Sequence, residues 1–434
     1  VRYQTFRGTP DRQTVIVWFH SIIVPKFLSM NGLTPHTLTD QSLTATTPDR
    51  VLPDYRGGIV NLMSSLLLGL GGEANGYAPL PALPVDAIRD CRKVALIIVD
   101  GLGDSFLSGR ASASFLAGAR RGRLTSVFPS TTASAVTSFL TGVAPQQHGL
   151  TGWHMYFREL GAVLAVLPGR PRFGGSTLQQ AGVDVGAFHG HRNVFERLGV
   201  SSAVISPAEI AHSDFNRAHL GPATLSAYRS MDHFFNCLTE ALTPPNGPRF
   251  VYAYWPELDR VAHEFGARSE AAERHFLDWD QAFGRFLERI AGTDALIIVT
   301  ADHGFIDTAP EQMIDLEHHP ELADCLALPL CGEPRVGYCY LRPGCAERFE
   351  AYLREHLSAA IDCFRSDDLI RAGWFGLGDA HPRLHERVGD YTLIMKDRWV
   401  IRDRIFGEEP FRQRGVHGGL SSEEMWVPLL TFRT

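Results

Sequence analysis

The chain has 434 residues, of which 44% are hydrophobic and 21% are charged, a composition that is ordinary for a globular protein. Its length allows two or three domains, or one large α/β domain with insertions. The formal net charge of −7 gives no bulk attraction for nucleic acid or for an anionic membrane. A phosphate substrate is still compatible with this charge, because bound metal ions can supply local positive charge.

The first 48 residues are Thr-rich in their second half and show no clear periodicity, so we expect residues 1–48 to be a disordered or loosely packed leader. The apolar run Val15–Val24 weakly resembles a signal peptide, but His20 interrupts it and Pro25 ends it. No run reaches the roughly 18 apolar residues of a membrane span. The seven cysteines are odd in number and contain no CxxC motif, which favours a reducing compartment and predicts a cytoplasmic location.

The first structural elements of residues 49–434 are an apolar helix at Gly58–Leu70 and a buried strand at Val94–Val99. Apolar and polar residues do not alternate along this strand, which is typical of a parallel sheet that is covered on both faces. It ends at Asp100, followed by Gly101-Leu102-Gly103. Ligands in open α/β sheets bind beyond the carboxyl ends of the strands, so Asp100 is a candidate functional residue.

The same pattern returns twice further along the chain. The strand-like run Arg249–Trp255 is followed by Pro256-Glu257-Leu258-Asp259, and the run Ala295–Thr300 is followed by Ala301-Asp302-His303-Gly304. Three buried strands that each end near an aspartate are difficult to explain by packing alone. We therefore predict an α/β fold with a mostly parallel central sheet, helices on both faces and cap insertions.

Two stretches interrupt this alternation of strands and helices. Residues 151–245 are rich in aromatic residues, glycine and histidine, and we interpret them as an insertion that covers the site. Residues 308–385 are interpreted as a second insertion, with a strand at Val336–Leu341 and a helix at Cys345–Leu357. A final strand, Tyr391–Met395, is expected to return to the core.

The stretch Phe128–Ala135 contains two adjacent threonines, Thr131 and Thr132, just before a predicted helix at Val136–Leu140. A helix N-terminus presents free N–H groups and the positive end of the helix dipole, which together suit a phosphate. The simpler alternative is that one of these hydroxyl side chains, or that of Ser130, only caps the helix.

Several Asp and His residues have a spacing that suits metal ligands. Asp259 and His263 are four residues apart and share one face of a helix; Asp302 and His303 can turn together into a cleft; His417 lies among glycines. Taken singly, these motifs are more often a surface pair, a turn or a loop histidine. Taken together with Asp100, they form a mixed Asp/His set that suits zinc or manganese.

The sequence resembles the alkaline phosphatase superfamily, and most closely its nucleotide pyrophosphatase/phosphodiesterase branch. The motifs that carry the resemblance appear in the family's order over roughly residues 50–434: Ile98–Gly101, Phe128–Thr132 followed by Thr141-Gly142 and His148-Gly149, Pro256–Asp259 with His263, Asp302–Gly304, and Gly415–Gly419.

The resemblance implies an alkaline phosphatase-like catalytic domain over residues 49–434 with two divalent metal ions, Zn²⁺ or Mn²⁺. One ion would be held by Asp259, His263 and His417. The other would be held by Asp100, Asp302 and His303 together with the nucleophile. The family's nucleophile falls on Thr132, with Thr131 as the alternative.

The chain departs from this branch at two positions. Nucleotide-cleaving members commonly have an Asn three residues after the nucleophile, where this chain has Ala135, and an Asp after the proline of the second motif, where it has Glu257. The sulfatase pattern is absent at the nucleophile. The first change weakens the expectation of a nucleotide substrate, whereas the second leaves the Asp259–His263 spacing unchanged.

The predicted function is therefore a two-metal hydrolase of phosphate esters, acting on phosphodiester or nucleotide pyrophosphate bonds through a covalent threonine-phosphoryl intermediate. The alternatives are a phosphomonoesterase or phosphonate hydrolase at the same site, and a non-catalytic metal-binding relative. The expected partner is a small-molecule phosphate ester. Trp153, His154 and Tyr156 are candidate pocket residues, and His189 and His191 are weaker candidates.

Overall fold

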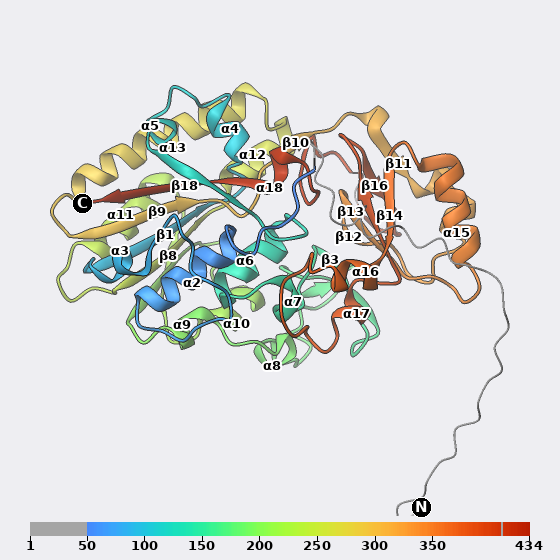
Figure 1. Cartoon of the computed structure of the whole chain (residues 1–434), viewed down its shortest axis with the longest axis horizontal. Coiled ribbons are helices and arrows are strands. Elements are labelled where there is room, and N and C mark those ends of the chain that lie inside the picture. The colour runs from blue at the N-terminus through green and yellow to red at the C-terminus, as the bar shows by residue number, and fades with distance from the viewer. Residues whose placement is uncertain (1–49, 409–410) are drawn as a thin grey trace, which may run out of the picture. The chain divides into compact units, whose positions relative to one another are not determined.

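The computed structural model describes residues 50–408 and 411–434. The predicted leader at residues 1–48 lies outside the described residues. The described chain forms two seven-stranded sheets and two short strand pairs (Figure 1). The short pairs are β10 (Ile306–Asp307) with β17 (Gly415–Val416), and β11 (Met313–Asp315) with β16 (Val400–Arg402).

The larger part of the core is built on a mostly parallel sheet. Strands β9, β1, β8, β6 and β7 are parallel neighbours, whereas β18 runs antiparallel to both β9 and β2 at one side. In sheet order the strands are β2 (Arg120–Thr125), β18 (Trp426–Arg433), β9 (Ala295–Thr300), β1 (Lys93–Val99), β8 (Phe250–Trp255), β6 (Ser202–Pro207) and β7 (Thr224–Tyr228).

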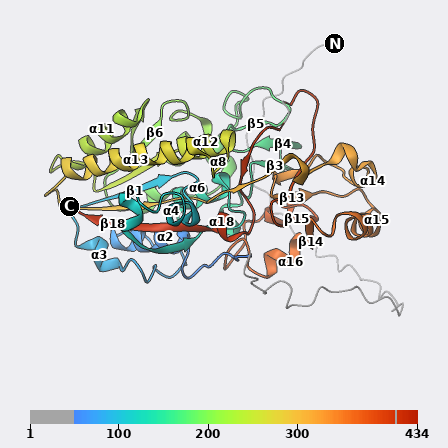
Figure 2. The same cartoon turned by 90° about the horizontal axis from the view of Figure 1, so that it is seen from above.

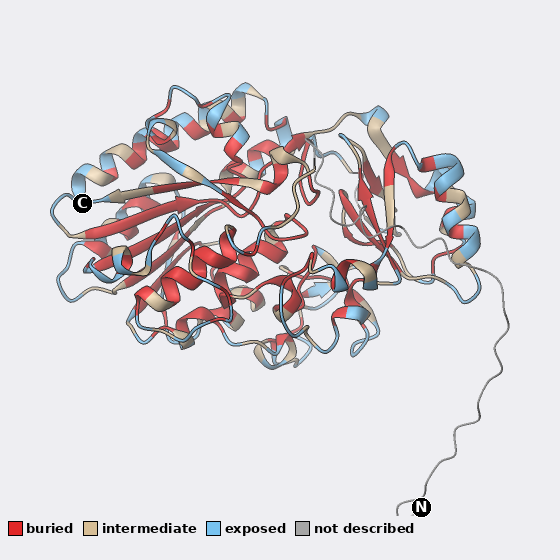
Figure 3. Ribbon diagram, in the orientation of Figure 1, coloured by how far each residue is buried: buried red, intermediate tan, exposed pale blue. Residues whose placement is uncertain are grey.

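Helices cover both faces of this sheet. Every residue of β1 and β9 is buried, which explains why these strands are apolar except at Lys93 and Thr300. Figure 2 shows α11 (Met231–Leu242) and α13 (Glu270–Arg289) on one face, and α2 (Ile59–Gly69) with α3 (Val85–Arg89) on the other. In Figure 3 the strands in the middle of the sheet are buried while the outer sides of the helices are exposed. The predicted α/β fold is confirmed.

The second sheet is antiparallel throughout. Its order is β14 (Ile361–Arg365), β15 (Tyr391–Met395), β13 (Val336–Cys339), β12 (Cys331–Glu333), β3 (His154–Phe157), β4 (Ala162–Ala165) and β5 (Arg170–Pro171). The expectation that Tyr391–Met395 returns to the central sheet is wrong, because this strand pairs with β13 and β14. The last strand of the central sheet is β18 instead.

The two ranges expected to be insertions contribute differently. Within 308–385, β12, β13 and β14 belong to the second sheet; the predicted helix there is α15 (Ala346–Tyr352), which continues into a π-helical turn at Leu353–Leu357. The range 151–245 is divided: β3, β4 and β5 lie in the second sheet, whereas β6 and β7 are strands of the central sheet. The domain boundaries themselves stay a prediction.

The remaining α-helices are mostly short. They are α4 (Asp104–Ser108), α5 (Phe115–Gly118), α6 (Thr132–Thr141), α7 (Pro145–His148), α8 (Val185–His189), α9 (Val194–Arg197), α10 (Asp214–Leu220), α12 (Glu257–Phe265), α14 (Pro320–Ala323), α16 (Ser366–Arg371), α17 (Leu384–Arg387) and α18 (Ser422–Met425). Among the described residues, no helix combines the length and the apolar character needed to cross a membrane. All seven cysteines are free thiols, and the cytoplasmic location stays a prediction.

Candidate active site

The predicted metal ligands other than His417 and Thr132 are brought together by three neighbouring parallel strands. In the sheet, β1 lies between β8 and β9, with Val99 paired to Trp255 and Ile98 paired to Thr300. The three strands therefore end side by side, and the residues that follow them meet at the same edge. Gly101 makes the turn after β1 possible: its φ of 75° favours glycine, and a Cβ there would lie 2.3 Å from the Phe305 ring.

The first group consists of Asp100, Asp302 and His303, all of them buried. His303 Nε2 lies 3.4 Å from Asp100 Oδ1 and 3.3 Å from Asp302 Oδ2. On the other side of the ring, His303 Nδ1 lies 3.1 Å from the Gly304 carbonyl oxygen. Nδ1 must donate in this contact, so Nε2 carries the lone pair and faces both carboxylates.

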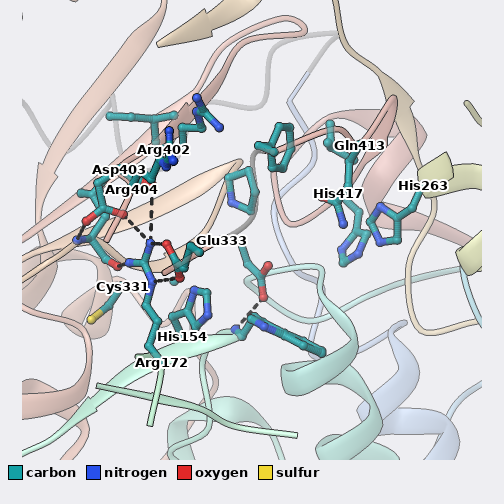
Figure 4. Close-up of a pocket in the computed structure, with 18 of the residues that line it drawn as sticks. His154, Arg172, His263, Cys331, Glu333, Arg402, Asp403, Arg404, Gln413 and His417 are labelled. Atoms are coloured by element: carbon teal, nitrogen blue, oxygen red, sulfur yellow. Dashed lines mark hydrogen bonds and ion pairs between the residues drawn. The ribbon is translucent and has the colours of Figure 1, made fainter. Parts of the chain in front are cut away.

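The second group consists of Asp259, His263 and His417. Asp259 and His263 share one face of α12, and His263 Nε2 lies 3.4 Å from Asp259 Oδ1. His263 Nδ1 donates to the Gly415 carbonyl at 2.8 Å, which again leaves Nε2 free as a ligand. His417 approaches from the glycine-rich segment after β17, with its Nε2 at 3.7 Å from Asp259 Oδ1 (Figure 4).

The two groups are adjacent, because the rings of His303 and His417 stack with centroids 3.6 Å apart. Their donor atoms also fit a metal ion. Asp100 Oδ1, Asp259 Oδ1 and Asp302 Oδ2 are buried without a hydrogen-bond partner. Burial raises the pKa of Asp100 well above its usual value, and the charges of Asp302 and Asp259 raise it further. Buried, unpaired carboxylate oxygens of this kind are relieved by a bound cation.

Thr132 lies beside the first group. It is the first residue of α6, and its Oγ1 is 3.1 Å from His303 Nε2. No side chain caps this helix: Thr131 donates instead to Glu333 Oε1 at 2.6 Å, and Ser130 donates to the Gly419 carbonyl at 2.7 Å. The capping alternative therefore does not hold, and the helix N-terminus remains available to an anion. Of the two threonines, Thr132 is the one whose hydroxyl reaches His303, whereas that of Thr131 reaches Glu333.

A cavity of about 520 Å³ opens beside Thr132, Asp259 and His417 (Figure 4). Trp153 and His154 line it, as expected from the sequence, whereas Tyr156 packs against Tyr340 instead. His189 and His191 are not among the lining residues. The other lining residues include four arginines and two acidic residues: Arg172, Arg402, Arg404, Arg412, Asp403 and Glu408. The Arg172 side chain is only 6% exposed, and ion pairs of 2.7 Å join it to both Asp403 and Glu408.

Two residues near the site were missed by the sequence analysis. Glu333, at the end of β12, lines the cavity and accepts hydrogen bonds of 2.6 Å from Thr131 Oγ1 and from the Trp153 N–H. Burial raises its pKa to about 7. Tyr254, in β8, donates its hydroxyl to Asp100 Oδ2 and so orients that carboxylate. No local motif marks either residue, although Tyr254 does lie next to the end of a strand.

A mostly parallel sheet whose carboxyl edge collects two Asp/His groups next to a helix-start threonine defines a hydrolase-like site of the alkaline phosphatase superfamily. The family model "Type I phosphodiesterase / nucleotide pyrophosphatase" matches residues 94–420. The chain belongs to this family, and the resemblance noted from the sequence is confirmed.

Solved structures share this fold at low sequence identity. Murine ectonucleotide pyrophosphatase/phosphodiesterase 5 is 17% identical, with a TM-score of 0.59 over 78% of this chain and 87% of that chain. The human protein of the same name is 17% identical, with a TM-score of 0.60 over the same shares. Phosphonoacetate hydrolase from Sinorhizobium meliloti 1021, in complex with phosphonoformate, is 19% identical, with a TM-score of 0.56 over 79% of this chain and 90% of that chain. A comparison with curated proteins finds no match.

Proposed function

We propose that this protein is a metal-dependent hydrolase of phosphate esters, that its substrates are phosphodiesters or nucleotide pyrophosphates, and that Thr132 is its nucleophile. The observation that carries the proposal is the position of the Thr132 hydroxyl. It lies at the uncapped start of α6, 3.1 Å from the His303 Nε2 atom that also faces Asp100 and Asp302. A helix N-terminus beside a nucleophile and a metal-ligand set suits a phosphoryl group.

Two divalent metal ions fit the two ligand groups. Asp259, His263 and His417 would hold one; Asp100, Asp302 and His303, with Thr132, would hold the other. Oxygen and imidazole donors without thiolate favour zinc or manganese. When bound, such ions lower the pKa of a coordinated hydroxyl and offset the negative charge on phosphoryl oxygens.

The chain's own residues then perform two in-line displacements. In the first, Thr132 Oγ1 gives its proton to water and attacks phosphorus; the bond from phosphorus to one ester or anhydride oxygen breaks, and the departing alcohol or phosphate takes up a proton from water. The second ester group stays on the phosphoryl group, which is now bonded to Thr132. In the second displacement, water attacks from the opposite side and releases a phosphomonoester and free Thr132. The N–H groups at the start of α6 orient the phosphoryl oxygens throughout.

The cavity favours a diester over a monoester. Its volume of about 520 Å³ is larger than a phosphate group needs and accommodates a second organic group against Trp153 and Phe411. Glu333 is the second reason. Its carboxylate, once ionised, repels the dianion of a monoester more strongly than the monoanion of a diester.

A phosphonate hydrolase is the second candidate, and two observations favour it. The position at which nucleotide-cleaving members carry an Asn is Ala135, which is fully buried and offers no amide to a phosphoryl oxygen. In addition, one structure with this fold is named phosphonoacetate hydrolase.

A substrate panel tests these candidates. Purified protein is supplied with zinc or manganese and assayed against bis-p-nitrophenyl phosphate, p-nitrophenyl phosphate, a nucleotide pyrophosphate and phosphonoacetate. Thr132→Ala is assayed in parallel to measure background. The proposal predicts the highest kcat/KM for one of the two diester-type substrates. A preference for phosphonoacetate selects the second candidate, and hydrolysis of none of the four would overturn both.

A further inference from the structure

Three histidines outside the candidate active site lie close together, and all come from the part of the sequence between β5 and β7. His189 is the last residue of α8, His191 lies two positions further along the chain, and His219 lies in α10. One ring nitrogen from each lies within 4.8 Å of the others. The three rings also contact one another face to face or at a tilt, with centroids between 5.0 and 5.7 Å apart. None of the three lines the active-site cavity.

The closest contact of this histidine cluster is between two ring nitrogens. His191 Nε2 lies 2.7 Å from His219 Nε2. His219 Nδ1 lies 2.7 Å from the Phe215 carbonyl oxygen and must donate to it, so His219 Nε2 carries a lone pair that points at His191.

Neither tautomer of His191 satisfies the cluster with protein atoms alone. If Nε2 carries the proton, it donates to His219, but Nδ1 is then a buried acceptor that has no donor. If Nδ1 carries the proton, two lone pairs oppose each other at 2.7 Å, and Nδ1 is a buried donor without a partner. A cation between the two Nε2 atoms relieves this opposition, because both lone pairs become its ligands.

His189 offers another ring nitrogen as a metal ligand, because its Nδ1 is buried and has no hydrogen-bond partner. The nearby His148 shows the contrast. Its Nδ1 accepts from the Leu150 N–H at 3.1 Å, and its Nε2 lies 3.1 Å from Ser138 Oγ, so both of its ring nitrogens are satisfied. The cluster therefore differs from an ordinary packed core histidine.

The cluster is built of neutral imidazoles, the form of histidine that binds metals. Burial lowers the pKa of His191 to about 3 and that of His219 to about 4, and it lowers the pKa of His189 as well. No carboxylate and no thiolate belongs to this group in the part of the chain that the structure describes. Such a donor set disfavours magnesium and calcium, which require oxygen ligands, and suits zinc.

We propose that His189, His191 and His219 form a third metal site, separate from the candidate active site, which binds a zinc ion and joins α8 to α10. Tetrahedral zinc with bonds of about 2.0–2.1 Å requires ligand nitrogens roughly 3.3 Å apart. The Nε2 atoms of His191 and His219, now 2.7 Å apart, would therefore move apart, within a group whose ligand atoms all lie within 4.8 Å of one another. The role is structural: the ion would add a link between two short helices that already pack against each other through contacts such as that of His189 with Phe215. This site does not depend on the proposed function.

The test is the zinc content of the full chain after loading with zinc and removal of free metal. His191→Ala removes the least buried of the three histidines. His219→Ala removes the one whose Nδ1 is hydrogen-bonded to the Phe215 carbonyl oxygen. His212→Ala is the matched control, since His212 is exposed and precedes the same helix. Circular dichroism and gel filtration confirm that each variant is folded.

The proposal predicts that each ligand variant holds about one zinc ion per chain less than wild type, while His212→Ala holds as much as wild type. Zinc added to metal-free protein should also raise the melting temperature less for His191→Ala than for the control. Equal zinc content in wild type and folded His191→Ala would show that the three histidines only pack against one another and do not bind zinc. Because the readout is metal content, a failure of the proposed hydrolase activity would not affect the result.

Discussion

Glu424→Gln is expected to destabilise the protein by an amount that the structure allows us to work out. The Glu424 carboxylate is fully buried and accepts from four donors. Oε1 accepts from Arg335 Nε at 3.1 Å and the Gly419 N–H at 2.8 Å; Oε2 accepts from Arg335 Nη2 at 3.1 Å and the Ser421 N–H at 3.3 Å. These bonds fix the segment that follows His417.

A glutamine amide has one oxygen and one NH₂ group, so in either orientation two of these donors face another donor. The substitution also leaves the buried Arg335 charge without its counter-ion. Hydrogen bonds to charged groups contribute about 1.5–3 kcal/mol each, and breaking a buried ion pair costs about 3–5 kcal/mol. We therefore expect a loss of about 3–5 kcal/mol in the free energy of unfolding.

Urea denaturation at pH 7, followed by tryptophan fluorescence, measures this loss. Glu257→Gln is the control, because Glu257 pairs with Arg260 at 2.7 Å in a half-exposed position, where such a pair contributes about 0–1 kcal/mol. If Glu424→Gln were no more destabilising than this control, the reasoning from burial and donor count would be refuted.

Three further predictions concern chemistry and pH. Thr132→Ala should lower kcat for a diester by at least about 10³-fold while the metal content stays unchanged; a wild-type rate in this variant would exclude Thr132 as the nucleophile. Glu333→Gln should raise kcat/KM for p-nitrophenyl phosphate relative to bis-p-nitrophenyl phosphate by about tenfold above pH 7, and an unchanged ratio would exclude charge repulsion by Glu333. Burial raises the pKa of Glu424, but the Arg335 charge and the hydrogen bonds from Arg335, Ser421 and Gly419 together outweigh this effect and hold the pKa below its ordinary value of 4.5. The stability that Glu424 supplies is therefore present above about pH 4.5 and is lost as the pH falls through the lowered pKa, so the stability gap between wild type and Glu424→Gln should narrow only in acid.

The ligand groups could be predicted from the sequence because their geometry follows from simple rules. Parallel strands end at a common edge, so residues after β1, β8 and β9 must meet there. The helical spacing of Asp259 and His263 places both on one face of α12. Their roles as metal ligands, and that of Thr132 as nucleophile, stay predictions that the proposed experiments test.

Other features could not be predicted, because they depend on contacts between distant parts of the chain. Tyr391–Met395 is buried and apolar except at Thr392, and such a run looks the same in either sheet, so its placement in the second sheet had no local signal. Glu333 reaches Thr131 across 202 positions of the chain. His189 and His191 were considered as pocket residues, but their contact with His219 depends on how α8 packs against α10.

The most direct test of the central claim is the hydrolysis of bis-p-nitrophenyl phosphate by one preparation before chelation, after chelation, and after zinc or manganese is restored. The two Asp/His groups around Asp100 and Asp259 predict that activity disappears with the metal and returns with it. Diester hydrolysis that continues at the same rate in metal-free protein would contradict the claim.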